Sequence, residues 1–113
     1  MRVNLVISKK EMEMFVKKTV DISNKQGIFA GLKVMEIDYD YGGGSVIVHM
    51  RFVSDNDDNA KTGIASLVNN LMSIIKKEDP SIFNSIKIIP KYNLFQNNLV
   101  LSLHGSFFYI VEK

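Results

Sequence analysis

The sequence contains no cysteine in its 113 residues. This absence excludes disulfide bonds, thiolate metal sites and cysteine nucleophiles, and it is typical of proteins from a reducing compartment. Long apolar runs are also missing: no stretch approaches the ~20 residues that a membrane-spanning helix needs. The apolar run near the N-terminus is too short for a signal peptide. We therefore expect a cytoplasmic protein that does not bind membranes.

Arginine is scarce, with two residues against twelve lysines, and the formal net charge is only +2. This balance lacks the strongly clustered positive charge of a dedicated nucleic-acid-binding protein. The apolar content of 46% and the charged content of 23% are ordinary for a globular protein. The length predicts a single domain over residues 1–113, which buries about two-thirds of the surface of its unfolded chain.

Residues 32–54 predict a β-hairpin, because apolar and polar residues alternate on both sides of the glycines at 42–44. The apolar positions, which we expect to face the core, are Met35, Ile37, Tyr39, Tyr41, Val46, Val48, Met50 and Phe52. Apolar residues face each other only if paired residue numbers sum to an odd value. A sum of 87 leaves a four-residue GGGS loop and pairs Glu36 with Arg51, and Asp38 with His49. A sum of 85 gives a two-residue Gly-Gly turn. The opposite charges favour 87.

Two amphipathic helices flank this hairpin. Ser8 and Glu11 fit a capping box, which starts a helix that runs to about Asn24. We expect its buried residues to be Met12, Phe15, Val16, Thr19, Val20 and Ile22. The second helix, from about Ala60 to Glu78, carries one apolar stripe: Ile64, Leu67, Val68, Leu71, Ile74 and Ile75. Pro80 ends it and favours a short extra turn through Asn84. Ile28 and Phe29 are expected beneath the first hairpin.

The residues from Ser85 onward predict a second hairpin with a longer second arm. A two-residue turn at Asn97 and Asn98 would pair Leu94 with Leu101, Tyr92 with Leu103, Ile88 with Phe107 and Ile86 with Tyr109. Pro90 cannot donate a backbone hydrogen bond, which favours an edge strand or a bulge. Gly105 favours a bulge or a bend.

The predicted order of elements is β-α-β-β-α-β with an extra C-terminal strand or hairpin. This order predicts an α+β, two-layer sandwich with a mostly antiparallel sheet and two helices on one face. It resembles the ferredoxin-like arrangement in element order, and that fold carries many unrelated functions.

Glu36, Asp38 and His49 are the residues that could form an acid–base or metal site. Their spacing matches no known ligand set, so we predict no catalytic residue, no metal and no cofactor. The glycines at 42–44 join two strands, whereas a phosphate-binding loop leads into a helix. A small enzyme or ligand-binding protein is accordingly the third hypothesis.

Nucleic-acid binding is the second hypothesis. The third predicted strand lacks the aromatic signature of an RNA-binding sheet, and the acidic residues at 36–40 would repel phosphate. Lys87, Lys91 and Phe95 on the outer side of the second hairpin form the best alternative patch.

The leading hypothesis is protein–protein interaction, as an assembly, adaptor or inhibitory factor. We expect one side of the second hairpin to fill the core with Ile86, Ile88, Leu101, Leu103, Phe107 and Tyr109. The other side then presents Ile89, Val100, Phe108 and Ile110. Two helices cover only one face of the sheet, and exposed apolar patches commonly mark partner surfaces. We therefore expect a non-enzymatic protein that contacts a protein partner or self-associates as a homodimer through this hairpin.

Overall fold

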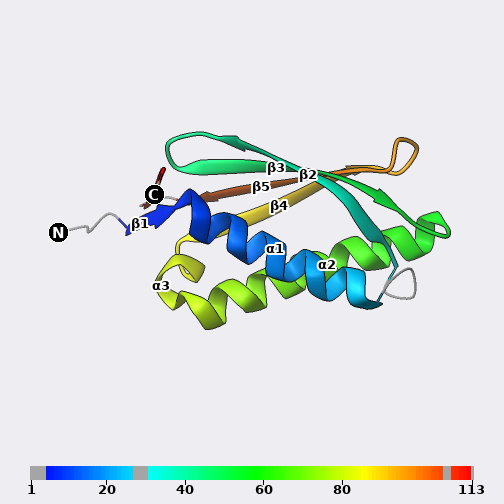
Figure 1. The fold of residues 1–113 in the computed structure, drawn as a ribbon, viewed down its shortest axis with the longest axis horizontal. Helices are drawn as coiled ribbons and strands as arrows, with labels where there is room; N and C mark the ends of the chain where they lie inside the picture. The colour runs from blue at the N-terminus through cyan, green and yellow to red at the C-terminus, as the bar shows by residue number, and fades with distance from the viewer. Residues whose placement is uncertain (1–4, 27–30, 106–107, 113) are drawn as a thin grey trace.

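The computed structural model describes residues 5–26, 31–105 and 108–112, with the side chains of Leu5 and Phe108 outside that description. Its elements are β1 (Leu5–Ser8), α1 (Lys9–Gln26), β2 (Lys33–Tyr41), β3 (Ser45–Val53), α2 (Asp57–Glu78), α3 (Pro80–Phe83), β4 (Ile86–Asn93), β5 (Asn98–Gly105) and β6 (Phe108–Val111). Figure 1 shows one layer of strands and one layer of helices, so the predicted α+β sandwich is confirmed.

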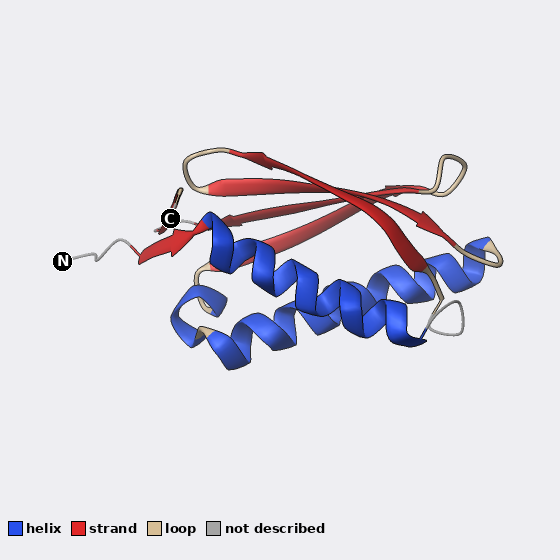
Figure 2. Ribbon diagram, viewed as in Figure 1, coloured by secondary structure: helices blue, strands red, loops and turns tan. Residues whose placement is uncertain are grey.

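The main sheet has the strand order β2-β3-β5-β4, and all its neighbouring pairs are antiparallel. β4 is therefore an edge strand, which confirms the position expected from Pro90. β1 lies outside this sheet and pairs in parallel with β6. Both α1 and α2 lie on the same face of the sheet (Figure 2).

The register of the β2–β3 hairpin is the predicted one. Glu36 pairs with Arg51 and Asp38 with His49, and the Gly42 N–H donates to the Ser45 carbonyl at 2.8 Å. The burial of Met35 was predicted wrongly, since its side chain is 49% exposed. A register shift between Val34 and Glu36 inserts one residue there. This bulge brings Val34 into the core in place of Met35.

The first helix begins as predicted: the Ser8 hydroxyl accepts a hydrogen bond from the Glu11 N–H at 3.0 Å. It continues two residues beyond Asn24, to Gln26. Ile22 was expected in the core and is instead 42% exposed. The residue that faces inward at this turn is Ser23. It lies three residues after Val20 and four after Thr19, so it falls on the same buried side of the helix.

The second helix starts at Asp57, three residues before the predicted start, because Asn56 caps it. The Asn56 side chain accepts from the Asn59 N–H at 2.8 Å. The predicted apolar stripe is confirmed, with four residues buried and Val68 and Ile74 packed partly against the core. The extra turn after Pro80 is α3, and the Asp79 side chain caps it.

The register of the β4–β5 hairpin was predicted wrongly. Tyr92 pairs with Leu99 and Ile88 with Leu103. The loop is longer than two residues because Asn93 accepts from the Gln96 N–H at 3.2 Å, and Asn97 takes the left-handed conformation with φ 56°. The two registers differ by an even number of positions, so each side chain of β4 and β5 still lies on its predicted face.

The C-terminal arm does not continue as one strand. β5 ends at Gly105, where a bulge or a bend was expected, and β6 pairs with β1. Tyr109 was predicted in the core and is 54% exposed, whereas Ile110 was predicted to face outward and packs against the core. The cause is the change of partner, since Ile110 lies beside the buried Ile7. Ile28, Phe29 and Phe107 lie outside the described residues.

Candidate functional site

One face of the main sheet is covered by α1 and α2, and no described helix or strand covers the other (Figure 2). We call this second side the open face. Its side chains come from alternate positions of four strands, because successive residues of a strand point to opposite sides. They are Lys33, Glu36, Asp38 and Asp40 of β2; Ser45, Ile47, His49, Arg51 and Val53 of β3; Asn98, Val100, Ser102 and His104 of β5; and Lys87, Ile89, Lys91 and Asn93 of β4.

The charges of the open face are sorted between its two edges. The β2 edge carries three exposed acids, Glu36, Asp38 and Asp40, against one exposed base, Lys33 at the start of the strand. Arg51 of β3 forms an ion pair with Glu36, so the edge is acidic on balance through Asp38 and Asp40. The β4 edge carries Lys87 and Lys91, also exposed. β3 and β5 separate the two edges. The face therefore has one acidic border and one basic border that run parallel to the strands.

The centre of the open face is apolar. Ile47 and Ile89 are both paired with Ser102, and Val100 lies two residues before Ser102 on β5. Diagonal neighbours on adjacent strands lie about 7–8 Å apart, within reach of side-chain contact. Ile89 is 45% exposed, and Ile47 and Val100 are half-buried. These three side chains form one apolar strip across β3, β5 and β4.

Two of the four predicted interface residues, Ile89 and Val100, lie together in this strip. Ile110 does not belong to it because it packs against the core from β6. The side chain of Phe108 lies outside the described part of the chain. Sequence reasoning missed Ile47, although its polar-side position in the first hairpin was visible from the alternation.

A hollow of about 240 Å³ lies on the open face and is lined by Glu36, Asp38, His49 and Arg51, among others. Arg51 donates to the Glu36 carboxylate at 2.9 Å, and both side chains are more than half exposed. Asp38 is the cross-strand neighbour of His49. Among the described residues, no group of three or more histidines, aspartates and glutamates is placed to hold a metal ion. Arg51 and Glu36 thus form an ion pair at a solvated surface, while Asp38 and Asp40 keep this edge acidic.

The alternative patch of Lys87, Lys91 and Phe95 lies at the β4 edge and the loop that follows it. Both lysines are on the open face, four residues apart on one strand. Phe95 is 98% exposed in the β4–β5 loop. A second hollow, of about 320 Å³, lies between Lys91 and the end of this loop.

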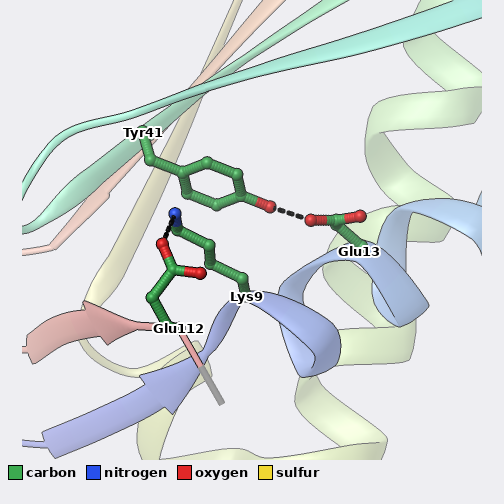
Figure 3. Close-up of polar contacts among 4 residues, drawn as sticks. All are labelled: Lys9, Glu13, Tyr41 and Glu112. Carbon is green, nitrogen blue, oxygen red and sulfur yellow. Dashed lines mark hydrogen bonds and ion pairs between the residues drawn. The ribbon is translucent and has the colours of Figure 1, made fainter.

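A cluster of four polar residues, which the sequence did not reveal, lies at the end of the sheet near β6 (Figure 3). The Tyr41 hydroxyl donates to the Glu13 carboxylate at 2.5 Å. Lys9 forms an ion pair with Glu112, and its ammonium group lies 4.6 Å from the centre of the Tyr41 ring. The cluster therefore ties α1 to β2 and to the residue after β6.

The chemistry of this cluster favours a structural role. Burial, the hydrogen bond to Glu13 and nearby negative charge raise the pKa of Tyr41 above its ordinary value. Burial and the charge of Glu13 raise the pKa of Tyr39 to about 12. Both phenols stay protonated at neutral pH, so the Tyr41 hydroxyl remains the donor in its hydrogen bond to Glu13.

Comparison with models of known protein families finds no match to this chain, and no curated protein is significantly similar to it. None of the described helices is long and apolar enough to cross a membrane.

Proposed function

We propose that the protein acts through protein–protein contact, without catalysis, and that it self-associates through the open face. The observation that carries this proposal is the apolar strip of Ile47, Ile89 and Val100 on the side of the sheet opposite both helices. A surface of this kind gains free energy by leaving water, at about 25 cal/mol per Å² of apolar area. The cysteine-free composition supports a cytoplasmic setting for this contact.

A second copy of the chain is the partner that the charges favour. A face with an acidic border and a basic border can complement another copy of itself, and two-fold dimers are the commonest homo-oligomers. The acidic border also argues against nucleic acid as the main ligand, because Glu36, Asp38 and Asp40 would repel phosphate along one side of the sheet.

The experiment is a comparison of masses in solution by size-exclusion chromatography with light scattering. Ile89→Asp places a charge in the apolar strip and should reduce a dimeric wild type to a monomer. Ile22→Asp is the matched control, since Ile22 is 42% exposed but lies on α1, in the helix layer. It should leave the mass unchanged. A wild type that is monomeric at high concentration would refute self-association.

Nucleic-acid binding remains the second candidate because of one observation. Phe95 is 98% exposed in the loop that follows β4, the strand that carries Lys91, and exposed aromatic side chains can stack on unpaired bases. Binding of single-stranded DNA or RNA at physiological salt that is abolished by Lys87→Glu, Lys91→Glu and Phe95→Ala would favour this candidate over the first.

A further inference from the structure

The sorted charges of the open face restrict how two copies can meet. Facing sheets pack with their strands nearly aligned or nearly orthogonal. In an aligned dimer, the two-fold axis lies between the sheets and runs either along the strands or across them. An axis across the strands sets each β2 edge over the partner's β2 edge. The acidic residues of one β2 edge would then oppose the acidic residues of the other, and like charges in opposition are unfavourable.

An axis along the strands exchanges the two edges. The β2 edge of one copy then lies over the β4 edge of the other, and the same contact occurs twice. Rotation about this axis also leaves the position of each residue along the strand direction unchanged. Residues that are paired with one another across the four strands, which we call a row, therefore lie opposite the same row of the other copy. Asp38, His49, Val100 and Lys91 form one such row through successive pairings. Asp38 of each copy is thereby directed toward Lys91 of the other copy.

Resting on the proposed function, we infer that two copies pack open face to open face about an axis parallel to the strands, with the acidic β2 edge of each over the basic β4 edge of the other. The apolar strips then meet near the axis, because β3 of one copy lies over β5 of the other. Asp40 belongs to the row next to that of Lys87. In the dimer, each of the two lysines of one copy therefore has an acidic residue of the other copy in the same row or the adjacent one.

The area of the open face indicates that its charged edges must be part of the dimer interface. Four strands spaced about 4.8 Å apart, each of about eight residues at about 3.3 Å, give a face of roughly 500 Å². Two such faces together reach about 1,000 Å², which is near the lower bound for a specific interface. The apolar strip alone is much smaller than this. The edges must therefore be covered as well, and their charges set the orientation.

Cysteine cross-linking tests this orientation cleanly, since the chain has no native cysteine. Asp38→Cys and Lys91→Cys are prepared separately, mixed, allowed to exchange subunits, and treated with a short bis-maleimide. Asp21→Cys, an exposed position on α1, is the control partner for Lys91→Cys. The expected result is a covalent dimer in the mixture of Asp38→Cys with Lys91→Cys. Either variant alone, and the mixture of Asp21→Cys with Lys91→Cys, should stay uncross-linked.

Light scattering on the same samples distinguishes a failure of the inferred orientation from a failure of self-association itself. A dimeric wild type in which Asp38→Cys cross-links to itself overturns the orientation and keeps self-association. A dimeric wild type with no cross-link in any combination removes the open face as the interface. A monomeric wild type refutes self-association itself, and the inferred orientation with it.

Discussion

Glu11 lies in the first turn of α1 near Asp79, the residue that caps α3. Burial, together with the negative charge of Asp79 and a hydrogen bond to its side chain, raises the pKa of Glu11 above 4.5. The raised pKa means that the folded state binds a proton more tightly than the unfolded state. The ionised form of Glu11 is therefore unfavourable to folding at neutral pH, and this penalty disappears as the pH falls through the folded pKa.

Glu11→Gln should accordingly stabilise the protein at pH 7 and raise Tm. The gain should vanish below the unfolded pKa, where Glu11 is already protonated in both states. The backbone bond to Ser8 is retained in this variant. Thermal unfolding monitored by circular dichroism at several pH values checks the expectation, with Asp21→Asn on the exposed side of the same helix as the control. An equal gain at acidic pH would show that charge is not the cause.

At the scale of elements, the start of α2 packs against the chain just before β2. A Cβ atom on Gly63 would lie 2.9 Å from backbone atoms of both Gly31 and Leu32. Gly31 itself has a φ of +111°, a conformation that L side chains rarely adopt. Two glycines thus let α2 and the entry to β2 approach more closely than any larger residues would permit.

Gly63→Ala should therefore destabilise the fold, by roughly 1–3 kcal/mol for overpacking. The sign of the change in the free energy of unfolding is informative, because replacing an exposed glycine inside a helix with alanine stabilises a protein by about 1 kcal/mol. Chemical denaturation measures the change in the free energy of unfolding. Gly43→Ala is the control, since a Cβ there has no atom within 4 Å, and it should be close to neutral. A stabilised Gly63→Ala variant would contradict the close packing.

The two hairpins show why one strand register could be predicted from the sequence and the other could not. In β2–β3, charged cross-strand partners such as Glu36 and Arg51 distinguish one register from its neighbours. In β4–β5, the predicted and observed registers place the same residues on each face, so alternation could not separate them. The loop geometry set by Asn93 and Asn97 decided the outcome. The bulge at Met35 likewise changes the faces without leaving a signal in the alternation.

At the scale of the whole molecule, the sequence predicted the layers and most of the residues of the open face. It could not predict the sorting of their charges, because that depends on strand order. The acidic strand and the lysine-bearing strand are opposite edges only because β3 and β5 pair in the middle of the sheet. β6 was also beyond prediction, since its apolar run fits a longer hairpin as well as it fits the observed pairing with β1.

The central claim is that copies meet through the open face, with their charged edges in contact. Two charge-reversed variants test it: Lys87→Glu with Lys91→Glu, and Asp38→Lys with Asp40→Lys. In the first variant both edges are acidic, and in the second both are basic. All four side chains are exposed, so the monomers should remain folded. Like-charged edges should prevent each variant from pairing with itself, whereas the two together restore opposite charges at both edges.

The measurement is the mass of each variant alone and of their equimolar mixture, by light scattering at low ionic strength, where surface charges are least screened. We predict a dimer for the wild type, a monomer for each variant alone and a dimer for the mixture. Variants that keep the wild-type mass when alone, or a mixture that stays monomeric beside a dimeric wild type, would contradict the claim.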